Sequence, residues 1–451
     1  MLSRRAFSST TVYCLLKRPQ FDINATISRI EEYEHSIKGR QLNNSIEVLS
    51  ALKLLPTQHD EFKKLTSEMA KIQTERKKIE SLIKTNKADI SSNQTILKSL
   101  KSKFQTMNES ITSLNSSMNE TCSSLPNLLH GSCPLTEPRI VQWINPKETY
   151  APNPQLSHVE IMTRKKMIDL KKASQVTGTS WYYLLNSGAE LEMALVKYAI
   201  DIAKKRGFSL VIPPSVTRLD IINSCGFRPR DMNNENQIYK IGDDIGSNDR
   251  KGLIATAGIS LAGLGYDEVI NLDETQGIKK SYGVSRSYRA EAGARGKDTK
   301  GLYRVHEFTK VELFCWCKPE LSEQLLKSLK NLQIEIITEL GLSAKVLNMP
   351  ANDLGNPAFM KYYIEAWMPG RGSFGEISST SNCTDFQSRR LNTKYRDVHD
   401  GKLHFAYTLN GTAMAVPRIM LALVENFYDP TTDKIHIPTC LRPYMNDIES
   451  I

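Results

Sequence analysis

Hydrophobic residues recur every three or four positions in two runs between about residues 60 and 122, and the intervening positions are mostly polar. This spacing leaves one narrow apolar seam on each helix, which is typical of a coiled coil rather than of a helix buried in a globular core. The short segment 85–95 lets the second helix fold back, so the pattern predicts an antiparallel helical hairpin. The seam positions are Phe62, Leu65, Met69, Ile72, Arg76, Ile79 and Ile83, then Leu97, Leu100, Phe104, Met107, Ile111, Leu114 and Met118.

A longer helical pattern lies near the middle of the chain. Residues 189–200 carry apolar side chains at helical spacing, and the pattern closes at Gly207. Residues 209–214 are rich in β-branched and apolar residues and end in two prolines, which are rare inside a strand. We therefore expect a helix that leads directly into a short strand.

A third pattern carries candidate chemistry. Residues 288–291 and 301–312 have the composition of two antiparallel strands joined by a glycine-rich loop. Side chains alternate along a strand, so Arg289 and Glu291 are expected on one face of the first strand. Phe308, Lys310 and Glu312 are expected together on one face of the returning strand. Such a pair of strands would offer cations, carboxylates and an aromatic plane on one wall.

Composition limits the class of protein. A length of 451 residues predicts two or three domains, and 40% hydrophobic with 24% charged residues fits a globular protein with a core. No apolar stretch approaches the roughly 18 residues that span a bilayer, so we expect no membrane association. The eight cysteines have no CxxC spacing, which argues against a zinc site, and the chain is too long for a disulfide scaffold. The net charge of +10 weakly favours a polyanionic partner such as a nucleic acid.

The amino-terminal segment has a composition of its own. Residues 1–20 are basic and rich in hydroxyl side chains, and the first acidic residue is Asp22. This composition is typical of a mitochondrial targeting segment and predicts a location in the mitochondrial matrix. A disordered basic terminus without a targeting role is the alternative.

The predicted hairpin is also basic. Residues 1–130 contain 19 Lys and Arg against 13 Asp and Glu, and many of the cations lie on the first helix and toward the tip. One interpretation is a lever that lays these cations against the phosphates of a folded RNA. The other is an ordinary solvated charged face, and this segment alone does not separate the two.

Several stretches resemble the motifs of class II aminoacyl-tRNA synthetases, and specifically those of the seryl-tRNA synthetase family. Residues 189–214 resemble motif 1, residues 288–312 resemble motif 2, and residues 409–418 resemble motif 3. Residues 376–390 and the ending 441–445 are similar to further stretches of this family. The resemblance covers the chain from about residue 25 onward.

The resemblance implies an α+β fold in which a coiled-coil hairpin precedes a catalytic domain built on an antiparallel sheet flanked by helices. The implied division is a targeting segment at 1–20, a tRNA-binding domain at 21–130 and a class II catalytic domain at 131–451. It also implies a homodimer that activates serine with ATP and transfers it to serine tRNA. A synthetase-like protein that has lost charging and binds RNA or regulates is the alternative. A pure coiled-coil interaction protein would leave the enzyme-like sequence unexplained.

The resemblance further implies which residues bind ATP. Arg289 and Arg418 would be the catalytic cations, because a guanidinium suits the charge that develops on phosphate. Glu376 and Ser379 would bind Mg²⁺, since a carboxylate and a hydroxyl are hard ligands. The implied ATP-binding set is Arg289, Ala290, Glu291, Arg304, Phe308, Glu376, Ile377, Ser378, Ser379 and Arg418.

The serine site departs from the family pattern at one position. The family carries Thr-x-Glu in the loop that receives the serine ammonium, whereas this chain has Thr256 followed by Gly258 at the glutamate position. A lost charged hydrogen bond costs about 1.5–3 kcal/mol, and no replacement carboxylate is evident from the sequence. The implied serine-binding set is Thr256, Gly258, Arg289, Glu312, Asn410 and Thr412.

Three further residues near these motifs have open roles. Arg389 and Arg390 can be functional cations or ion-pair scaffolding. For His306 we expect packing and hydrogen bonding rather than catalysis.

Overall fold

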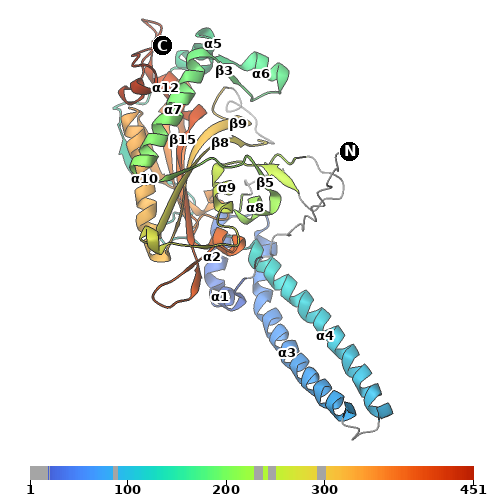
Figure 1. Ribbon diagram of the computed structural model, residues 1–451. Coiled ribbons are helices and arrows are strands. Elements are labelled where there is room, and N and C mark those ends of the chain that lie inside the picture. Colours follow the sequence, from blue (N-terminus) through green and yellow to red (C-terminus); the bar gives the residue numbers. More distant parts are fainter. Residues whose placement is uncertain (1–18, 20, 85–89, 228–236, 242–249, 292–300) are drawn as a thin grey trace, which may run out of the picture.

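The computed structural model describes residue 19 and residues 21–84, 90–227, 237–241, 250–291 and 301–451 (Figure 1). The predicted targeting segment therefore lies outside the described residues, apart from residue 19. No helix in the described part of the chain is long and apolar enough to cross a bilayer. A helical hairpin projects from a body in which helices cover a large sheet, as the sequence predicts.

The hairpin is made of α3 (Ser45–Lys84) and α4 (Ile90–Ser124). Every predicted seam position is buried or half-buried, while most positions between them are exposed, so the two apolar runs are confirmed. The polar seam member Arg76 places its guanidinium 5.5 Å from the centre of the Phe104 ring. Both helices begin earlier than predicted. α3 begins at Ser45 rather than near residue 60, and α4 begins at Ile90, within the segment 85–95 that was expected to connect the two helices.

The base of the hairpin packs on two short helices, α1 (Ile23–Ile27) and α2 (Ile30–Arg40). Their shared core contains Ile37, Leu52 and Met118. Arg40 at the end of α2 is fully buried, and its guanidinium donates to the carbonyls of residues 127, 128, 355 and 358. A buried guanidinium needs such acceptors, and here they come from both the arm and the body. Arg40 thus joins the two parts.

The body is built on an eight-stranded sheet in the order β1-β10-β11-β12-β15-β9-β8-β4. Every neighbouring pair of strands in this sheet is antiparallel except β8 and β4, which are parallel at one edge, and the expectation of an antiparallel sheet did not include this parallel pair. The strands are β1 (Arg139–Ile144), β4 (Ser209–Val211), β8 (Ile278–Tyr288), β9 (Glu307–Cys317), β10 (Ala344–Asn348), β11 (Met360–Met368), β12 (Ser373–Asn382) and β15 (Tyr407–Ala415).

Alternation along β9 decides which face of the sheet receives the site. Leu313 and Cys315 point into the main core, which they share with α7 (Asn186–Lys205), α10 (Ser322–Glu339) and α12 (Val416–Phe427). Phe314 and Trp316 point to the other face and pack in a second core with α9 (Ala257–Gly263). By the same alternation the even-numbered residues of β9 near its start face the side that α7, α10 and α12 leave open.

Smaller elements complete the body. They are α5 (His158–Arg164), β2 (Ile168–Asp169), α6 (Leu170–Val176), β3 (Tyr183–Leu184), β5 (Val216–Arg218), α8 (Leu219–Ser224), β6 (Lys251–Leu253), β7 (Val269–Ile270), α11 (Phe386–Leu391), β13 (Lys394–Arg396), β14 (Leu403–Phe405), β16 (Tyr428–Asp429) and β17 (Lys434–Ile435). The α+β class, with a helical hairpin before a sheet domain flanked by helices, is confirmed. The division at residues 20 and 130 stays a prediction.

Candidate active site

The paired strands predicted around residues 288–312 are β8 and β9, but the site residues of the first stretch lie beyond its end. β8 stops at Tyr288, and the backbone N–H of Arg289 donates to the carbonyl of His306, 2.8 Å away. Glu291 has a φ of 45°, in the left-handed region, so strand alternation does not set its direction. The strand argument for Arg289 and Glu291 was therefore wrong, although both side chains line the same pocket. The loop at 292–300 lies outside the described residues.

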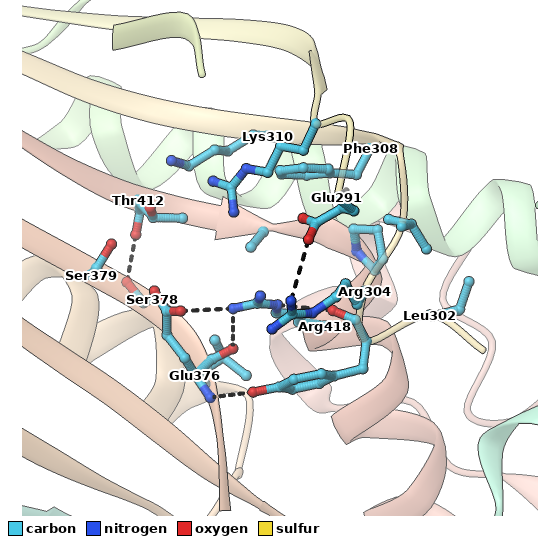
Figure 2. Close-up of a pocket in the computed structure, with 16 residues that line it drawn as sticks. Glu291, Leu302, Arg304, Phe308, Lys310, Glu376, Ser378, Ser379, Thr412 and Arg418 are labelled. Carbon is cyan, nitrogen blue, oxygen red and sulfur yellow. Dashed lines mark hydrogen bonds and ion pairs between the residues drawn. The ribbon is translucent and has the colours of Figure 1, made fainter. Parts of the chain in front are cut away.

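This pocket collects most of the predicted ATP-binding residues (Figure 2). Its walls come from the β8 end, the start of β9, the middle of β12 and the junction of β15 with α12. Ala290 is absent from the lining, and its backbone N–H donates to the carbonyl of Gln237. The lining residues are Arg289, Glu291, Leu302, Tyr303, Arg304, Val305, Phe308, Lys310, Glu376, Ile377, Ser378, Ser379, Thr412, Ala415, Pro417 and Arg418.

Arg418 and Glu376 form an ion pair in the floor of this pocket. Nη1 of Arg418 lies 2.9 Å from Oε2 of Glu376 and also donates to the Glu376 carbonyl. Burial opposes both charges, but each charge stabilises the other, so the net effect raises the pKa of Arg418 and lowers that of Glu376. Both groups are therefore charged, and Figure 2 shows them side by side.

Arg289 lies against Phe308, with its guanidinium carbon 5.2 Å from the ring centre. Burial, and next the charge of Arg418, lower the pKa of Arg289. Its Nε has no hydrogen-bond acceptor among the described residues. A half-buried cation whose buried Nε is an unused donor, beside a second arginine, is an arrangement that favours an anionic ligand. Across the pocket, Arg304 pairs with Glu291 at 3.4 Å.

A β-bulge brings Glu376 and Ser379 to the same wall. In the ladder between β11 and β12, Glu365 opposes Glu376 and Ile364 opposes Ser378, so Ile377 is an extra residue. An extra residue reverses the alternation of side chains, which lets positions three apart share one face. Ser378 instead donates its hydroxyl to the carbonyl of Thr412, 2.7 Å away. The carboxylate of Glu376 and the hydroxyl of Ser379 fit a hard divalent cation by their chemistry.

The predicted serine residues gather around Glu312, which is buried. Its Oε2 lies 2.5 Å from Nζ of Lys310, and Lys310 also donates to the Thr256 hydroxyl at 3.2 Å. Asn410 donates to Oε1 of Glu312 at 3.5 Å, and Thr412 is the cross-strand neighbour of Glu312. Burial raises the pKa of Glu312, while Lys310 acts in the opposite direction.

Gly258 belongs to the same cluster. It lies in the first turn of α9. Thr256 caps this helix, because its hydroxyl accepts a hydrogen bond from the backbone N–H of Gly258. A Cβ atom at residue 258 would lie 3.5 Å from Oε1 of Glu312, which is an ordinary contact. The structure therefore places the family's missing glutamate position directly beside Glu312.

Tyr303 is a pocket residue that the motif resemblance did not single out. Its ring contacts two guanidinium groups, with the ring centre 3.9 Å from the guanidinium carbon of Arg371 and 4.7 Å from that of Arg418. Its hydroxyl accepts the backbone N–H of Glu376, and its carbonyl accepts Nε of Arg418. The only signal in the sequence is its place directly before Arg304, which does not reveal these contacts.

The three residues with open roles now have structural partners. His306 stacks on Trp181 and its Nδ1 lies 2.8 Å from the Tyr239 hydroxyl, which confirms packing and hydrogen bonding. Arg390 is buried and donates to the carbonyls of residues 123, 125 and 386. Arg389 pairs with Asp385 at 3.8 Å. Arg390 therefore links the end of the hairpin to the body, and Arg389 also donates to the Tyr33 hydroxyl on α2, so the contacts of both arginines agree with a scaffolding role.

Known proteins resemble this chain over nearly its whole length. Residues 239–427 match the tRNA synthetase class II core domain (G, H, P, S and T). The chain is 56% identical over 446 residues to the mitochondrial serine–tRNA ligase of Saccharomyces cerevisiae, with 99% of each chain covered. It is 36% identical over 434 residues to the serine–tRNA ligase of Borrelia recurrentis, covering 94% of this chain and 97% of that one.

Among solved structures, the fold is similar to that of seryl-tRNA synthetase from Pyrococcus horikoshii complexed with ATP. The TM-score is 0.84 at 29% identity, with 96% of this chain and 99% of that chain covered. Identity above one half along essentially the full length, together with the match to the class II core, establishes the family. The chain belongs to the seryl-tRNA synthetase family of ATP-dependent class II ligases.

Proposed function

We propose that this protein activates serine with ATP to form seryl-adenylate and then transfers the seryl group to serine tRNA in the mitochondrial matrix. The observation that carries the proposal is that two sets of residues lie next to each other. A pocket with three arginines and Phe308 adjoins the buried cluster of Glu312, Lys310 and Thr256 through their shared strand β9. The first set suits a nucleoside triphosphate, and the second suits a small polar amino acid.

The first step joins the serine carboxylate to the α-phosphorus of ATP. A carboxylate oxygen forms the new bond to phosphorus while the bond to the β-phosphate oxygen breaks, which releases pyrophosphate. The carboxylate is already ionised near neutral pH, so no general base is needed. Catalysis instead requires that the repulsion between anions be neutralised and that the reactants be held in line. Arg289 would contact the α-phosphate and the incoming carboxylate.

The remaining charged residues would bind the other parts of ATP. Arg304 and Arg418 would hold the outer phosphates, and Phe308 would stack on the adenine with Glu291 at its amino edge. Glu376 and Ser379 would hold Mg²⁺, which supplies positive charge to the triphosphate when it is bound. In the structure Glu376 pairs with Arg418, so the carboxylate is already ionised and directed into the pocket.

Serine would bind beside Glu312. Glu312, Asn410 and Thr412 would receive its hydroxyl, and Thr256 would lie near its ammonium. Alanine would leave these buried polar groups without a partner, which costs more than the loss of one methyl contact and therefore gives specificity. In the second step a hydroxyl of the terminal adenosine attacks the carbonyl carbon of the adenylate, and AMP leaves.

The hairpin, the location and the oligomeric state are proposed on separate grounds. Exposed lysines along α3 would contact the phosphates of tRNA. Residues 1–20 and the mitochondrial yeast relative support import into mitochondria. Exposed apolar residues on and after α7, such as Met193 and Ile212, support a homodimer.

Serine-dependent exchange of pyrophosphate into ATP tests the first step directly. Arg289→Ala and Arg418→Ala should each lower the exchange rate by at least about a hundredfold, because each removes a charge contact made in the transition state. Arg139→Ala is the matched control, since this arginine is exposed on β1. A wild-type protein that catalyses no exchange at any serine concentration would support the alternative of a synthetase-like binding protein.

A further inference from the structure

A buried histidine and a buried glutamate lie behind the wall of the ATP pocket. His158 at the start of α5 is 6% exposed, and Glu425 near the end of α12 is 1% exposed. Nδ1 of His158 lies 2.7 Å from Oε1 of Glu425. Neither residue lines the pocket, and the adenylation chemistry described above uses neither. Two polar side chains buried so deeply need partners, and those partners indicate what the pair does.

The hydrogen bonds of His158 fix its tautomer. The backbone N–H of Leu302 donates to Nε2 of His158 across 3.1 Å. A backbone N–H is always a donor, so Nε2 must carry the free lone pair and Nδ1 must carry the proton. Nδ1 then donates to Glu425. The carboxylate therefore holds the imidazole in the one tautomer that can accept from Leu302.

Glu425 also holds a second segment next to the pocket. Its Oε2 accepts the backbone N–H of Arg371 at 3.0 Å, and the guanidinium of Arg371 covers the Tyr303 ring. Glycines leave room for these contacts. A Cβ at Gly370 would lie 2.8 Å from Cδ of Glu425, and a Cβ at Gly375 would lie 2.6 Å from the Tyr303 ring. Both distances are shorter than real side-chain contacts allow.

A third glycine, Gly301, lies against the His158 ring itself. Gly301 has a φ of 90°, which favours glycine, and a Cβ there would collide with Nε2 of His158. Residues 301–303 thus approach the His158–Glu425 pair from one side, and the turn at residues 369–372 approaches it from another. Tyr303 lies where the two segments meet.

We propose that His158 and Glu425 are positioning residues that fix residues 301–304 and, through Tyr303, the ATP-binding ion pair of Arg418 and Glu376. Tyr303 contacts both members of that pair, since its carbonyl accepts from Arg418 and its hydroxyl accepts from the backbone of Glu376. Arg304, the next residue, contributes another pocket cation. The pair thereby sets the position of the pocket's cations without touching the nucleotide.

Two substitutions of His158 separate this role from simple packing. In His158→Gln the side-chain oxygen can replace Nε2 as the acceptor for Leu302, whereas in His158→Asn the amide can replace only the Nδ1 donor to Glu425. We expect the dissociation constant of a non-hydrolysable ATP analogue to rise about tenfold in His158→Asn and to stay within about threefold of wild type in His158→Gln. The KM for ATP should likewise rise in His158→Asn and stay close to wild type in His158→Gln, while the KM for serine stays unchanged in both variants.

The outcomes distinguish positioning from stability. Partial unfolding reduces the active fraction and hence kcat, but it leaves the affinity of the folded molecules unchanged, so binding is measured by calorimetry with the active fraction fitted. Equal affinity in His158→Asn and wild type, or equal loss in both variants, would overturn the inference. The inference rests on the proposed ATP site. Wild-type protein that binds the analogue without catalysing exchange would contradict the proposed function while leaving the binding comparison valid.

Discussion

At the scale of single residues, the neighbourhood of Glu312 explains what Gly258 changes. Glu312 and Lys310 form a close ion pair, and the charge of Arg289 also acts on Glu312. Bound serine would add an ammonium group, so the single carboxylate of Glu312 would have to balance both this ammonium and Lys310. A second carboxylate at residue 258 would lie against Glu312 and would balance the added charge only when serine is present.

Gly258→Glu should therefore bind serine more tightly and be less stable without it. A charge-assisted hydrogen bond to the ammonium contributes about 1.5–3 kcal/mol at best, so the KM for serine should fall by up to about ten- to a hundredfold. Without serine, the two neighbouring carboxylates repel each other and the Tm should fall. Saturating serine should restore the Tm, because the ligand stabilises the folded state. Serine titration of exchange and thermal unfolding are the two measurements.

Gly258→Gln is the matched control for this substitution, since it has the same size without the charge. It should give no decrease in the KM for serine. The backbone at residue 258 has no left-handed φ, so neither side chain strains the main chain. A KM that rises in Gly258→Glu, with its Tm unchanged, would show that the serine ammonium lies away from residue 258.

At the scale of elements, the sequence predicts which strands carry the site better than it predicts where their side chains point. The pairing of β9 with β8 is unbroken along the strand, so the shared face of Phe308, Lys310 and Glu312 could be predicted from the period of two of a regular strand. The bulge at Ile377 could not, because it depends on pairing with β11, and the left-handed φ of Glu291 could not, because nothing in the local pattern marks a non-glycine residue for that conformation. These are the places where local pattern and site geometry differ.

The hairpin gives a prediction about tRNA alone. Lys71, Lys77 and Lys78 are exposed in the second half of α3, a helix that projects away from the body (Figure 1). Replacing all three with alanine should leave pyrophosphate exchange unchanged and raise the KM for tRNA. Each phosphate contact contributes about 0.9 to the log–log salt slope, so this slope should fall by up to about 2.7. Aminoacylation measured over a range of salt concentrations gives both values.

The control for charge alone removes three exposed lysines from the body, Lys171, Lys172 and Lys402. These substitutions change the net charge by the same amount, and they should leave the KM for tRNA and its salt slope close to wild type. Equal effects of the two triple variants would mean that overall charge, and not the arm, attracts tRNA. Loss of exchange in the α3 variant would mean that the arm is needed for folding of the body.

At the scale of the whole molecule, the order of parts was predictable and their junction was not. The seam of the hairpin and the class II motifs each come from local sequence, and they gave a helical arm before a sheet domain. The arm is longer than predicted because residues 45–60 pack on α1, α2 and the end of α4 rather than forming a two-helix seam. Arg40 and Arg390, which join the arm to the body, use backbone carbonyls as acceptors. Backbone acceptors leave no signal in a sequence.

The last prediction concerns the surface that follows motif 1. Met193 on α7 is 73% exposed, and Ile212 just after β4 is 82% exposed. In the described part of the chain β4 pairs only with β8, so its outer edge is open. An open edge next to exposed apolar side chains is a surface that a second copy can cover, and a stable interface buries about 800 Å² on each partner.

Met193→Glu and Ile212→Lys should each convert a dimer into monomers, because burying an uncompensated charge costs several kcal/mol. Sedimentation equilibrium measures the mass, and Val398→Glu, which alters a 65% exposed residue beyond β13, should leave it unchanged. Wild-type protein that is monomeric at micromolar concentration, or variants that stay dimeric, would contradict this interface.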